Sequence, residues 1–123
     1  VSKIVAFYAT DIGRRLLQAT HVLKEVPFTL SIKTNGDDAQ IIQGVIDCMF
    51  EEADGEWVLL DYKTDKIFSH FAEGQALYKE MANRYETQLN YYTQAIESIK
   101  RVKVKEKVLY LYDIGQSLSM DVQ

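Results

Sequence analysis

The segment from residue 41 to residue 65 constrains the fold of this 123-residue chain more than any other. It contains two mainly apolar and β-branched runs, residues 41–50 and 57–62. The turn-forming pair Asp54-Gly55 lies between them, so the segment predicts two antiparallel strands joined by a tight turn. Asp47 and Asp61 interrupt the apolar runs. Because burying an unpartnered charge is costly, an aspartate inside a buried strand usually binds something.

The length of the turn decides which residue faces Asp47. A two-residue loop of residues 54–55 would set Asp47 opposite Tyr62. A three-residue loop of residues 53–55, with a type I turn followed by a left-handed glycine, would set Asp47 opposite Asp61. Directly opposed residues share a sheet face, with Cβ atoms roughly 4.5–5.5 Å apart. The longer loop therefore predicts that the two carboxylates converge.

Lys63 joins this predicted cluster, because it lies two residues beyond Asp61 in the same strand and so shares its face. Two carboxylates as close as Asp47 and Asp61 repel each other unless a cation lies between them. A hard divalent ion that prefers oxygen ligands, Mg²⁺ or Mn²⁺, is the natural candidate. A neighbouring lysine suits a reaction that develops negative charge, such as attack on a phosphodiester.

Four short motifs occur along the chain in this order: Glu25-Val26-Pro27-Phe28, Gly44-Val45-Ile46-Asp47, Asp61-Tyr62-Lys63 and Gln88-Leu89-Asn90-Tyr91-Tyr92. They resemble the E-x-P-F, G-x-x-D, D-x-K and Q-x-x-x-Y motifs of the RecB-like branch of the PD-(D/E)xK nuclease superfamily. The residues around them are most similar to the C-terminal nuclease domain of AddA/RexA-type bacterial helicase–nuclease subunits. The resemblance extends from about residue 13 to about residue 115.

The resemblance implies a set of metal ligands. Asp47, Asp61 and the main-chain carbonyl of Tyr62 would bind Mg²⁺ or Mn²⁺, and Glu25 would supply a further oxygen. The residues alone favour a structural glutamate at the entrance of a strand for Glu25, and the resemblance brings the metal-ligand interpretation level with it.

The resemblance also implies roles for three further side chains. Lys63 would orient the nucleophile or stabilise the developing charge. Gln88 and Tyr92 are four residues apart and so lie on one helix face, where they would line the active site and hold the DNA backbone or a water molecule. Helical periodicity offers an alternative, in which Tyr92 belongs to an apolar core stripe and Gln88 lies at its edge.

The resemblance implies a DNA nuclease that cleaves single strands unwound by an attached helicase motor. It would act in a double-strand-break repair complex with a partner subunit, in the bacterial cytoplasm. Two other functions stay open: a non-catalytic module of the same fold that docks a partner or guides a strand, and a free-standing structure-specific nuclease. The intact Asp47, Asp61 and Lys63 argue against the first.

Composition and net charge favour some of these functions over others. The net charge of −4 is unusual for an independent DNA-binding protein, and favours delivery of the DNA by another part of a larger protein. The single cysteine, Cys48, cannot form an internal disulfide or a self-contained four-cysteine iron–sulfur cluster, and we expect it to be a buried, inert thiol. No run is long and apolar enough to span a membrane, so we expect no membrane partner.

We expect residues 1–123 to form a single nuclease domain that is a fragment of a larger subunit, because the chain begins at Val1. RecB-like nucleases carry a motif histidine well upstream of the E-x-P-F stretch. His21 lies only four residues before Glu25, so it is not that histidine and is expected at the surface. The upstream part of the domain, with the motif histidine, is expected outside this segment.

The predicted order of elements indicates an α/β sandwich with a mixed sheet and flanking helices, in which the first three strands form a meander. The resemblance implies the restriction-endonuclease-like fold. The expected elements are a helical segment over residues 3–19 broken at 11–13, strands over 27–33, 41–50, 57–62 and 108–112, a weak helix over 69–83, and a firmer one over 84–100. The tail from residue 116 is expected to fray.

Two groups of surface candidates are assigned a structural role. Tyr85, Tyr110 and Tyr112 fall on core stripes, so stacking of DNA bases on tyrosine is the less favoured interpretation. The basic run of residues 100–107 is expected to be a solvated connector, although contact with DNA is an alternative.

Overall fold

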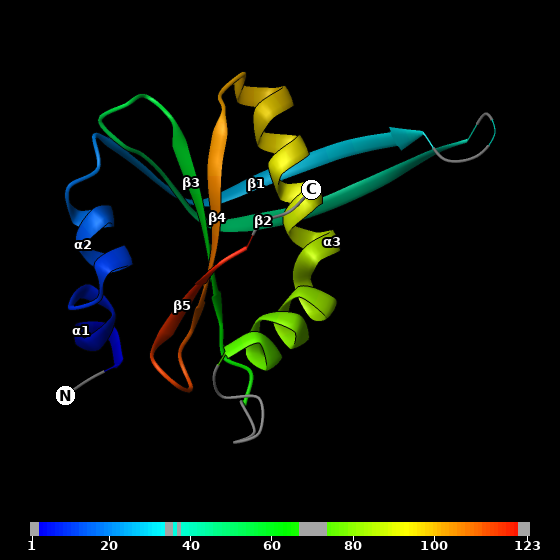
Figure 1. Ribbon diagram of the computed structural model, residues 1–123. Coiled ribbons are helices and arrows are strands. Elements are labelled where there is room, and N and C mark those ends of the chain that lie inside the picture. Colours follow the sequence, from blue (N-terminus) through cyan, green and yellow to red (C-terminus); the bar gives the residue numbers. More distant parts are fainter. Residues whose placement is uncertain (1–2, 34–35, 37, 67–73, 121–123) are drawn as a thin grey trace.

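The computed structural model describes residues 3–33, 36, 38–66 and 74–120. The described chain runs through two helices, three strands, one long helix and two further strands, which form a single sheet with helices on both sides (Figure 1). The elements are α1 (Lys3–Tyr8), α2 (Asp11–Leu17), β1 (His21–Lys33), β2 (Ala39–Glu51), β3 (Trp57–Lys63), α3 (Gly74–Lys100), β4 (Val104–Leu111) and β5 (Gln116–Ser119).

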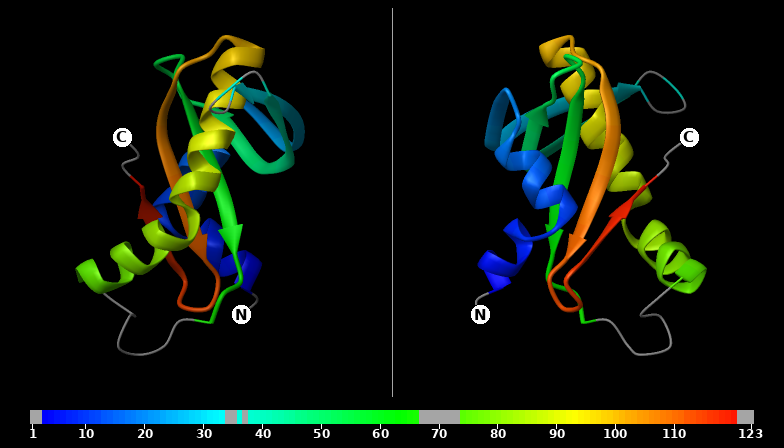
Figure 2. Two further views of the ribbon diagram at one scale, coloured as in Figure 1. Left: turned by 90° about the vertical axis from the view of Figure 1, so that its right-hand side faces the viewer. Right: turned by 60° about the vertical axis from the view of Figure 1, so that its left-hand side comes forward.

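The five strands follow one another in the sheet in the order β1-β2-β3-β4-β5. All neighbours are antiparallel except β3 and β4, which run parallel because the chain crosses over through α3 between them. Helices α1 and α2 cover one face of the sheet, and α3 covers the other (Figures 1 and 2). The expected α/β sandwich with a mixed sheet is confirmed, and its plan is consistent with the restriction-endonuclease-like fold.

Side chains from alternate strand positions build the core on the two faces. The face under α1 and α2 buries Phe7, Ile12, Leu16, Cys48, Phe50, Val58, Leu60, Val108 and Tyr110. The face under α3 buries two groups: Phe28, Ile46, Met49, Trp57, Leu59, Ala95, Ile96 and Val104, and then Leu77, Met81, Leu89, Leu109, Leu111 and Met120. Because strand β3 contributes to both faces, its seven residues are buried or half-buried.

The turn between β2 and β3 is the three-residue loop. The Glu52 N–H donates to the Glu56 carbonyl at 3.0 Å, and Gly55 takes a left-handed φ of 81°. The Gly55 N–H donates to the Glu52 carbonyl at 2.9 Å, which closes the turn. The ladder that follows runs from Glu51↔Trp57 to Cys48↔Leu60. This register is the one that places Asp47 opposite Asp61.

The helices differ from the sequence prediction in two places. The expected break at residues 11–13 is wrong, because the first helical segment breaks at Thr10, whose hydroxyl caps α2 by accepting the Gly13 N–H at 3.1 Å. Gly13 is instead a packing position, since an added Cβ would clash with the Phe7 backbone. The two helices expected over residues 69–83 and 84–100 are one helix that begins at Gly74, and residues 69–73 lie outside the described residues.

The strands also extend beyond their expected limits. Strand β1 begins at His21, so Pro27 lies inside the strand and not at its start. The sheet tolerates this proline because β1 is an edge strand. Strand β4 begins at Val104 and not at Val108. The tail expected to fray forms β5 through pairing with β4, a partner that local sequence patterns do not reveal.

Two lysines of the basic run near β4 form ion pairs within the fold. Lys105 lies 2.8 Å from Glu52 and 2.8 Å from Asp54, and Lys103 lies 3.2 Å from Glu56. The expectation of a solvated connector is wrong for Lys105, because strand β4 carries it against the β2–β3 turn. Lys103 precedes the strand and its side chain is 73% exposed, in agreement with the expectation.

Arg15 joins α2 to this network. Its guanidinium lies 2.7 Å from Glu52 and 2.8 Å from Glu106. The hydrogen bond from Arg15 is the main cause that lowers the pKa of Glu52 to about 2, against an ordinary value of 4.5. Arg15 thus fixes the N-terminal helices to the turn of the central hairpin.

We expect Arg15→Gln to lower the free energy of unfolding by roughly 1–2 kcal/mol at pH 7, a value reduced for the partial exposure of the pair. A depressed carboxyl pKa stabilises the fold above the unfolded pKa and loses that effect as the pH falls toward the folded value. The difference between wild type and variant should therefore shrink between about pH 4.5 and pH 2. Urea unfolding across this pH range measures it.

Arg14→Gln is the matched control. Arg14 is 57% exposed and pairs with Asp11, which is 91% exposed, so its loss should change stability by no more than about 0.5 kcal/mol. Equal effects of the two substitutions at pH 7 would contradict the role assigned to Arg15.

Candidate active site

The site lies at a fork in the sheet, where β2 separates from β3. Strand β2 pairs with β3 only from residue 48 to residue 51, whereas its pairing with β1 continues out to residue 39. Beyond the fork, β1 and β2 continue as a two-stranded ribbon that extends past α3 (Figure 1). Asp47 is the residue at which the two pairings part.

The Asp47 side chain links the two strands at the fork by a hydrogen bond. Its Oδ2 accepts the Tyr62 N–H at 2.9 Å, in place of the main-chain hydrogen bond that a continued ladder would make. The N–H and C=O of one strand residue point to the same side. The Tyr62 carbonyl therefore also points to the fork, as the predicted role in metal binding requires.

Asp61 is the only charged residue that is buried among the described residues, at 5% exposure. Burial raises the pKa of its carboxyl well above the ordinary range, and the nearby Asp47 carboxyl raises it further, against the opposing effect of Lys63. The two carboxyl groups therefore converge, as the three-residue turn predicted. The Asp61 Oδ2 atom is buried without a hydrogen-bond partner.

Lys63 is held beside these carboxylates. Its ammonium forms an ion pair with Asp61 Oδ2 at 3.0 Å and donates to Gln88 Oε1 at 2.8 Å. Gln88 is thus a partner of Lys63 across the gap between β3 and α3. The predicted D-x-K and Q-x-x-x-Y motifs meet in the structure at this hydrogen bond.

Tyr92 packs in the core, as the alternative from helical periodicity predicts. Its ring lies edge-on against Phe28, with centroids 5.2 Å apart. Burial raises the pKa of its phenol, and the charges of Asp61 and Asp47 raise it further. Tyr92 and Gln88 both line a hollow between the ribbon and α3.

The rings of Phe28 and Tyr92 explain why position 44 is a glycine. A Cβ at this position would lie 2.9 Å from Phe28 Cε1 and 3.6 Å from Tyr92 Cε1. The glycine of the G-x-x-D motif is therefore needed for close packing and not for its backbone conformation, since a positive φ is not found there.

Glu25 lies opposite Asp47 in the register of β1 and β2, where the ladder is interrupted. Its φ of 53° is left-handed, which for a residue with a side chain costs of order 1 kcal/mol. Glu25, Asp47 and Tyr62 line one open hollow. Within the described ranges, however, no three His, Cys, Asp or Glu side chains converge closely enough to hold a metal, so Glu25 stands beside the carboxylate pair and not within it.

The residues at the fork fit a hard divalent cation. Two carboxylates converge, a main-chain carbonyl points to the same place, and one buried carboxylate oxygen has no hydrogen-bond partner. A cation with oxygen ligands would satisfy that oxygen and relieve the repulsion that raises the pKa of Asp61. Cys48 lies nearby in the core, but burial raises the pKa of its thiol to about 11, so it is the inert thiol that the sequence predicted.

Sequence reasoning missed two residues near Lys63. The Tyr85 ring centroid lies 4.1 Å from the Lys63 ammonium, and the Tyr85 hydroxyl donates to Asp65 at 2.6 Å. The helical pattern assigns Tyr85 to the core stripe alone. Its spacing of three residues from Gln88 was the available signal, because residues at this spacing share a helix face.

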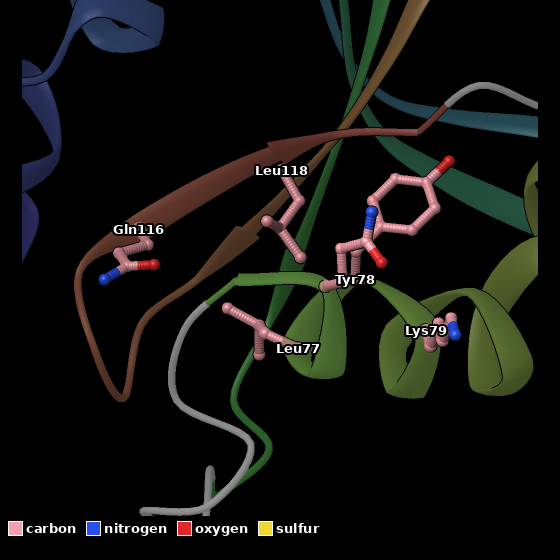
Figure 3. Close-up of a pocket in the computed structure, with 6 residues that line it drawn as sticks. Leu77, Tyr78, Lys79, Gln116 and Leu118 are labelled. Carbon is pink, nitrogen blue, oxygen red and sulfur yellow. The ribbon is translucent and has the colours of Figure 1, made fainter.

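Two other features lie outside the site. His21 is at the surface as expected, 71% exposed and paired with Glu51. A separate apolar hollow lies between the start of α3 and β5 and shares no residue with the carboxylate site (Figure 3). Its lining residues are Gln75, Leu77, Tyr78, Lys79, Gln116 and Leu118.

Among the residues that the structure describes, every helix is too short or too polar to cross a membrane.

Comparison with known proteins gives a consistent set of relatives. No protein-family model matches the chain. Three relatives, each named as the A-type subunit of an ATP-dependent helicase/nuclease, match nearly all of it. They come from Lysinibacillus sphaericus (52% identity over 96% of the chain), Bacillus velezensis (40% over 98%) and Pelotomaculum thermopropionicum (44% over 97%). The chain spans about a tenth (10%) of the length of each of these relatives.

We expect Asp61→Asn to stabilise the metal-free protein at pH 8. The amide keeps the size of the side chain and removes a buried charge whose raised pKa shows that ionisation is unfavourable in the fold. The gain should be roughly 1–2 kcal/mol, measured by thermal unfolding in a chelator. Glu86→Gln makes the same change of charge at an exposed position of α3 and should leave the midpoint unchanged. A lower midpoint for Asp61→Asn than for wild type would contradict this account.

We expect Gly44→Ala to destabilise the fold by about 1–2 kcal/mol, because the added methyl group forces the Phe28 ring toward Tyr92. Gln43→Ala is the control at the adjacent, exposed position. Chemical denaturation measures both. Similar midpoints for the two variants would show that the rings move freely and that Gly44 is not required for packing.

Proposed function

We propose that this chain is the metal-dependent DNA nuclease domain of an A-type subunit of an ATP-dependent helicase/nuclease, because it is similar over nearly its whole length to a segment of about a tenth (10%) of such subunits. It would hydrolyse phosphodiester bonds. The observation that carries the proposal is the pair of opposed aspartates at the fork, one of them buried with an oxygen whose charged neighbour is the Lys63 ammonium, 3.0 Å away. A fold that needed only stability would not retain this arrangement, because a neutral side chain would cost less.

In the proposed site, Asp47, Asp61 and the Tyr62 carbonyl bind Mg²⁺ or Mn²⁺. Glu25 lies in the adjoining hollow and completes the ligand set through a change of its side-chain conformation, either directly or through water. A bound divalent ion would supply Lewis-acid stabilisation of phosphoryl oxygens and a water molecule of lowered pKa. The exposed position of Glu25 leaves its side chain free to make this change.

Lys63 is the proposed catalytic cation. Its ammonium has three N–H donors, of which Gln88 engages one. The remaining donors are available to orient the nucleophile or to stabilise negative charge on the phosphoryl oxygens. The side chain is 15% exposed, so its charge acts where solvent screening is reduced. Gln88 therefore acts first by holding Lys63, and Tyr92 lines the adjoining hollow together with Gln88.

The charge distribution supports delivery of the DNA by another part of the protein. The net charge is −4, and Lys103 and Lys105 are paired with carboxylates of the fold. Long-range attraction of phosphate is therefore weak. We propose that a helicase motor in the same polypeptide delivers single strands to the fork, within a complex that processes double-strand breaks in the bacterial cytoplasm and includes a partner subunit.

The alternative of a non-catalytic docking module remains testable. It would not explain why Lys63 is joined both to the buried Asp61 of β3 and to Gln88 of α3. A free-standing structure-specific nuclease is less well supported, because the relatives are about ten times longer than this chain (10% coverage).

We expect Lys63→Ala or Asp61→Ala, in the complete helicase–nuclease polypeptide, to reduce DNA cleavage by at least about 100-fold with unchanged unwinding. Both residues lie at the fork and neither belongs to a motor. The measurements are nuclease assays with Mg²⁺ or Mn²⁺ on labelled single strands and a separate strand-displacement assay.

Lys79→Ala, which removes an exposed lysine from the start of α3, is the matched control and should cleave normally. Calorimetric titration with Mn²⁺ should show a binding event in wild type that Asp61→Ala removes. Wild-type cleavage by either fork variant, or equal Mn²⁺ binding by wild type and Asp61→Ala, would favour the docking module.

A further inference from the structure

The surroundings of Lys63 contain a contact that neither the motifs nor the relatives assign. Its ammonium is approached by the Asp61 carboxylate at 3.0 Å, the Gln88 carbonyl oxygen at 2.8 Å and the face of the Tyr85 ring, whose centroid is 4.1 Å away. A cation within about 6 Å of an aromatic centroid is attracted by the negative face of the ring. Tyr85 therefore lies at the distance of a cation–π contact with the proposed catalytic lysine.

The ring is itself fixed. The Tyr85 hydroxyl donates to Asp65, whose two oxygens lie 2.7 and 2.6 Å away. Arg84 donates to the same carboxylate at 2.9 Å, and Arg84 is paired in turn with Glu80 at 2.9 Å. This chain of contacts ties the end of β3 to the middle of α3. Burial and then the bond to Asp65 raise the pKa of Tyr85 to about 12, so its ring stays neutral.

We propose that Tyr85 is a positioning residue, whose ring holds the Lys63 ammonium in its working orientation and whose hydroxyl is anchored by Asp65. The proposal rests on the proposed role of Lys63 in phosphodiester cleavage. A lysine side chain has four rotatable bonds, and a point charge on so flexible a stem loses precision unless several groups fix it.

The nature of the contact explains why a ring suits this position. A second carboxylate at this position would compete with phosphate for the ammonium donors, and a second amide would occupy one of them. A ring face attracts the charge without a directional hydrogen bond. The N–H groups that Gln88 does not engage thus stay available to the substrate.

The contact also does not depend on the carboxylates. Any cation bound by Asp61 would share the charge of that carboxylate and weaken its attraction for Lys63. Gln88 and Tyr85 both lie on α3 and not on the strand that carries the two partners, so they would keep their contacts with Lys63. The helix, and not the strand, therefore sets the position of the ammonium during the reaction.

The test compares Tyr85→Leu, Tyr85→Phe and Tyr85→Trp in the complete helicase–nuclease polypeptide. Leucine removes the ring and keeps an apolar side chain, and we expect kcat for cleavage of single strands to fall by about tenfold, with KM within about twofold of wild type. Phenylalanine and tryptophan keep a ring, so kcat should stay within about threefold of wild type. Tyr78→Leu, on the first turns of the same helix, is the control for loss of a tyrosine and should retain kcat.

A second readout uses the metal-free protein. Reductive methylation followed by peptide mass spectrometry should modify Lys63 several-fold faster in Tyr85→Leu than in wild type, because the ammonium is no longer held and covered. Tyr85→Phe should protect Lys63 as wild type does. Thermal unfolding of each variant checks that the fold is kept.

The outcomes separate this inference from the proposed function. If Lys63→Ala is inactive while Tyr85→Leu has wild-type kcat and wild-type labelling, the positioning role is wrong and the nuclease assignment stands. A Tyr85→Phe variant as impaired as Tyr85→Leu would assign the effect to the hydroxyl and also overturn the proposal, as would an equal loss in Tyr78→Leu. Wild-type cleavage by Lys63→Ala would reject the proposed function itself.

Discussion

The burial of the Asp61 carboxyl is the constraint on which the other features of the site depend. It lies in a strand whose neighbours pack against helices on both faces, and its pKa is raised because the fold disfavours its charge. This carboxyl nevertheless lies within the sheet, with Asp47 opposite it and the Lys63 ammonium 3.0 Å from it. Such an arrangement carries a cost in stability, and sites of this kind are typical of catalysis and not of packing.

The fork between β2 and β3 makes this burial possible. If β2 had continued beside β3, the Tyr62 N–H would have bonded to a main-chain carbonyl and no space would remain for a ligand. Asp47 instead satisfies that N–H with its side chain, while the strained backbone of Glu25 interrupts the ladder on the other side. The ribbon beyond the fork then packs its Phe28 ring against Tyr92 of α3, so the departure of β2 is supported by core contacts.

Helix α3 covers the face of the sheet beside the fork. Tyr85, Gln88 and Tyr92 project from successive turns toward the fork, and each contacts either Lys63 or the ribbon. The same helix carries the crossover that makes β3 and β4 parallel. Displacing α3 would therefore disturb both the order of the sheet and the position of the Lys63 ammonium. Tyr92 packs in the core on the same helix, so its packing and the geometry around Lys63 depend on one placement of α3.

Local sequence patterns were sufficient to predict the hairpin register, the convergence of Asp47, Asp61 and Lys63, the class of fold and the buried state of Cys48. They succeeded because turn chemistry and strand alternation act over a few residues and have fixed periods. The remaining features required the folded chain. The existence of β5, the position of the helix break at Thr10 and the pairing of Lys105 depend on partners distant in the chain. The contacts of Lys63 with Gln88 and Tyr85 depend on how α3 lies across β3, and no pattern within either element specifies that distance.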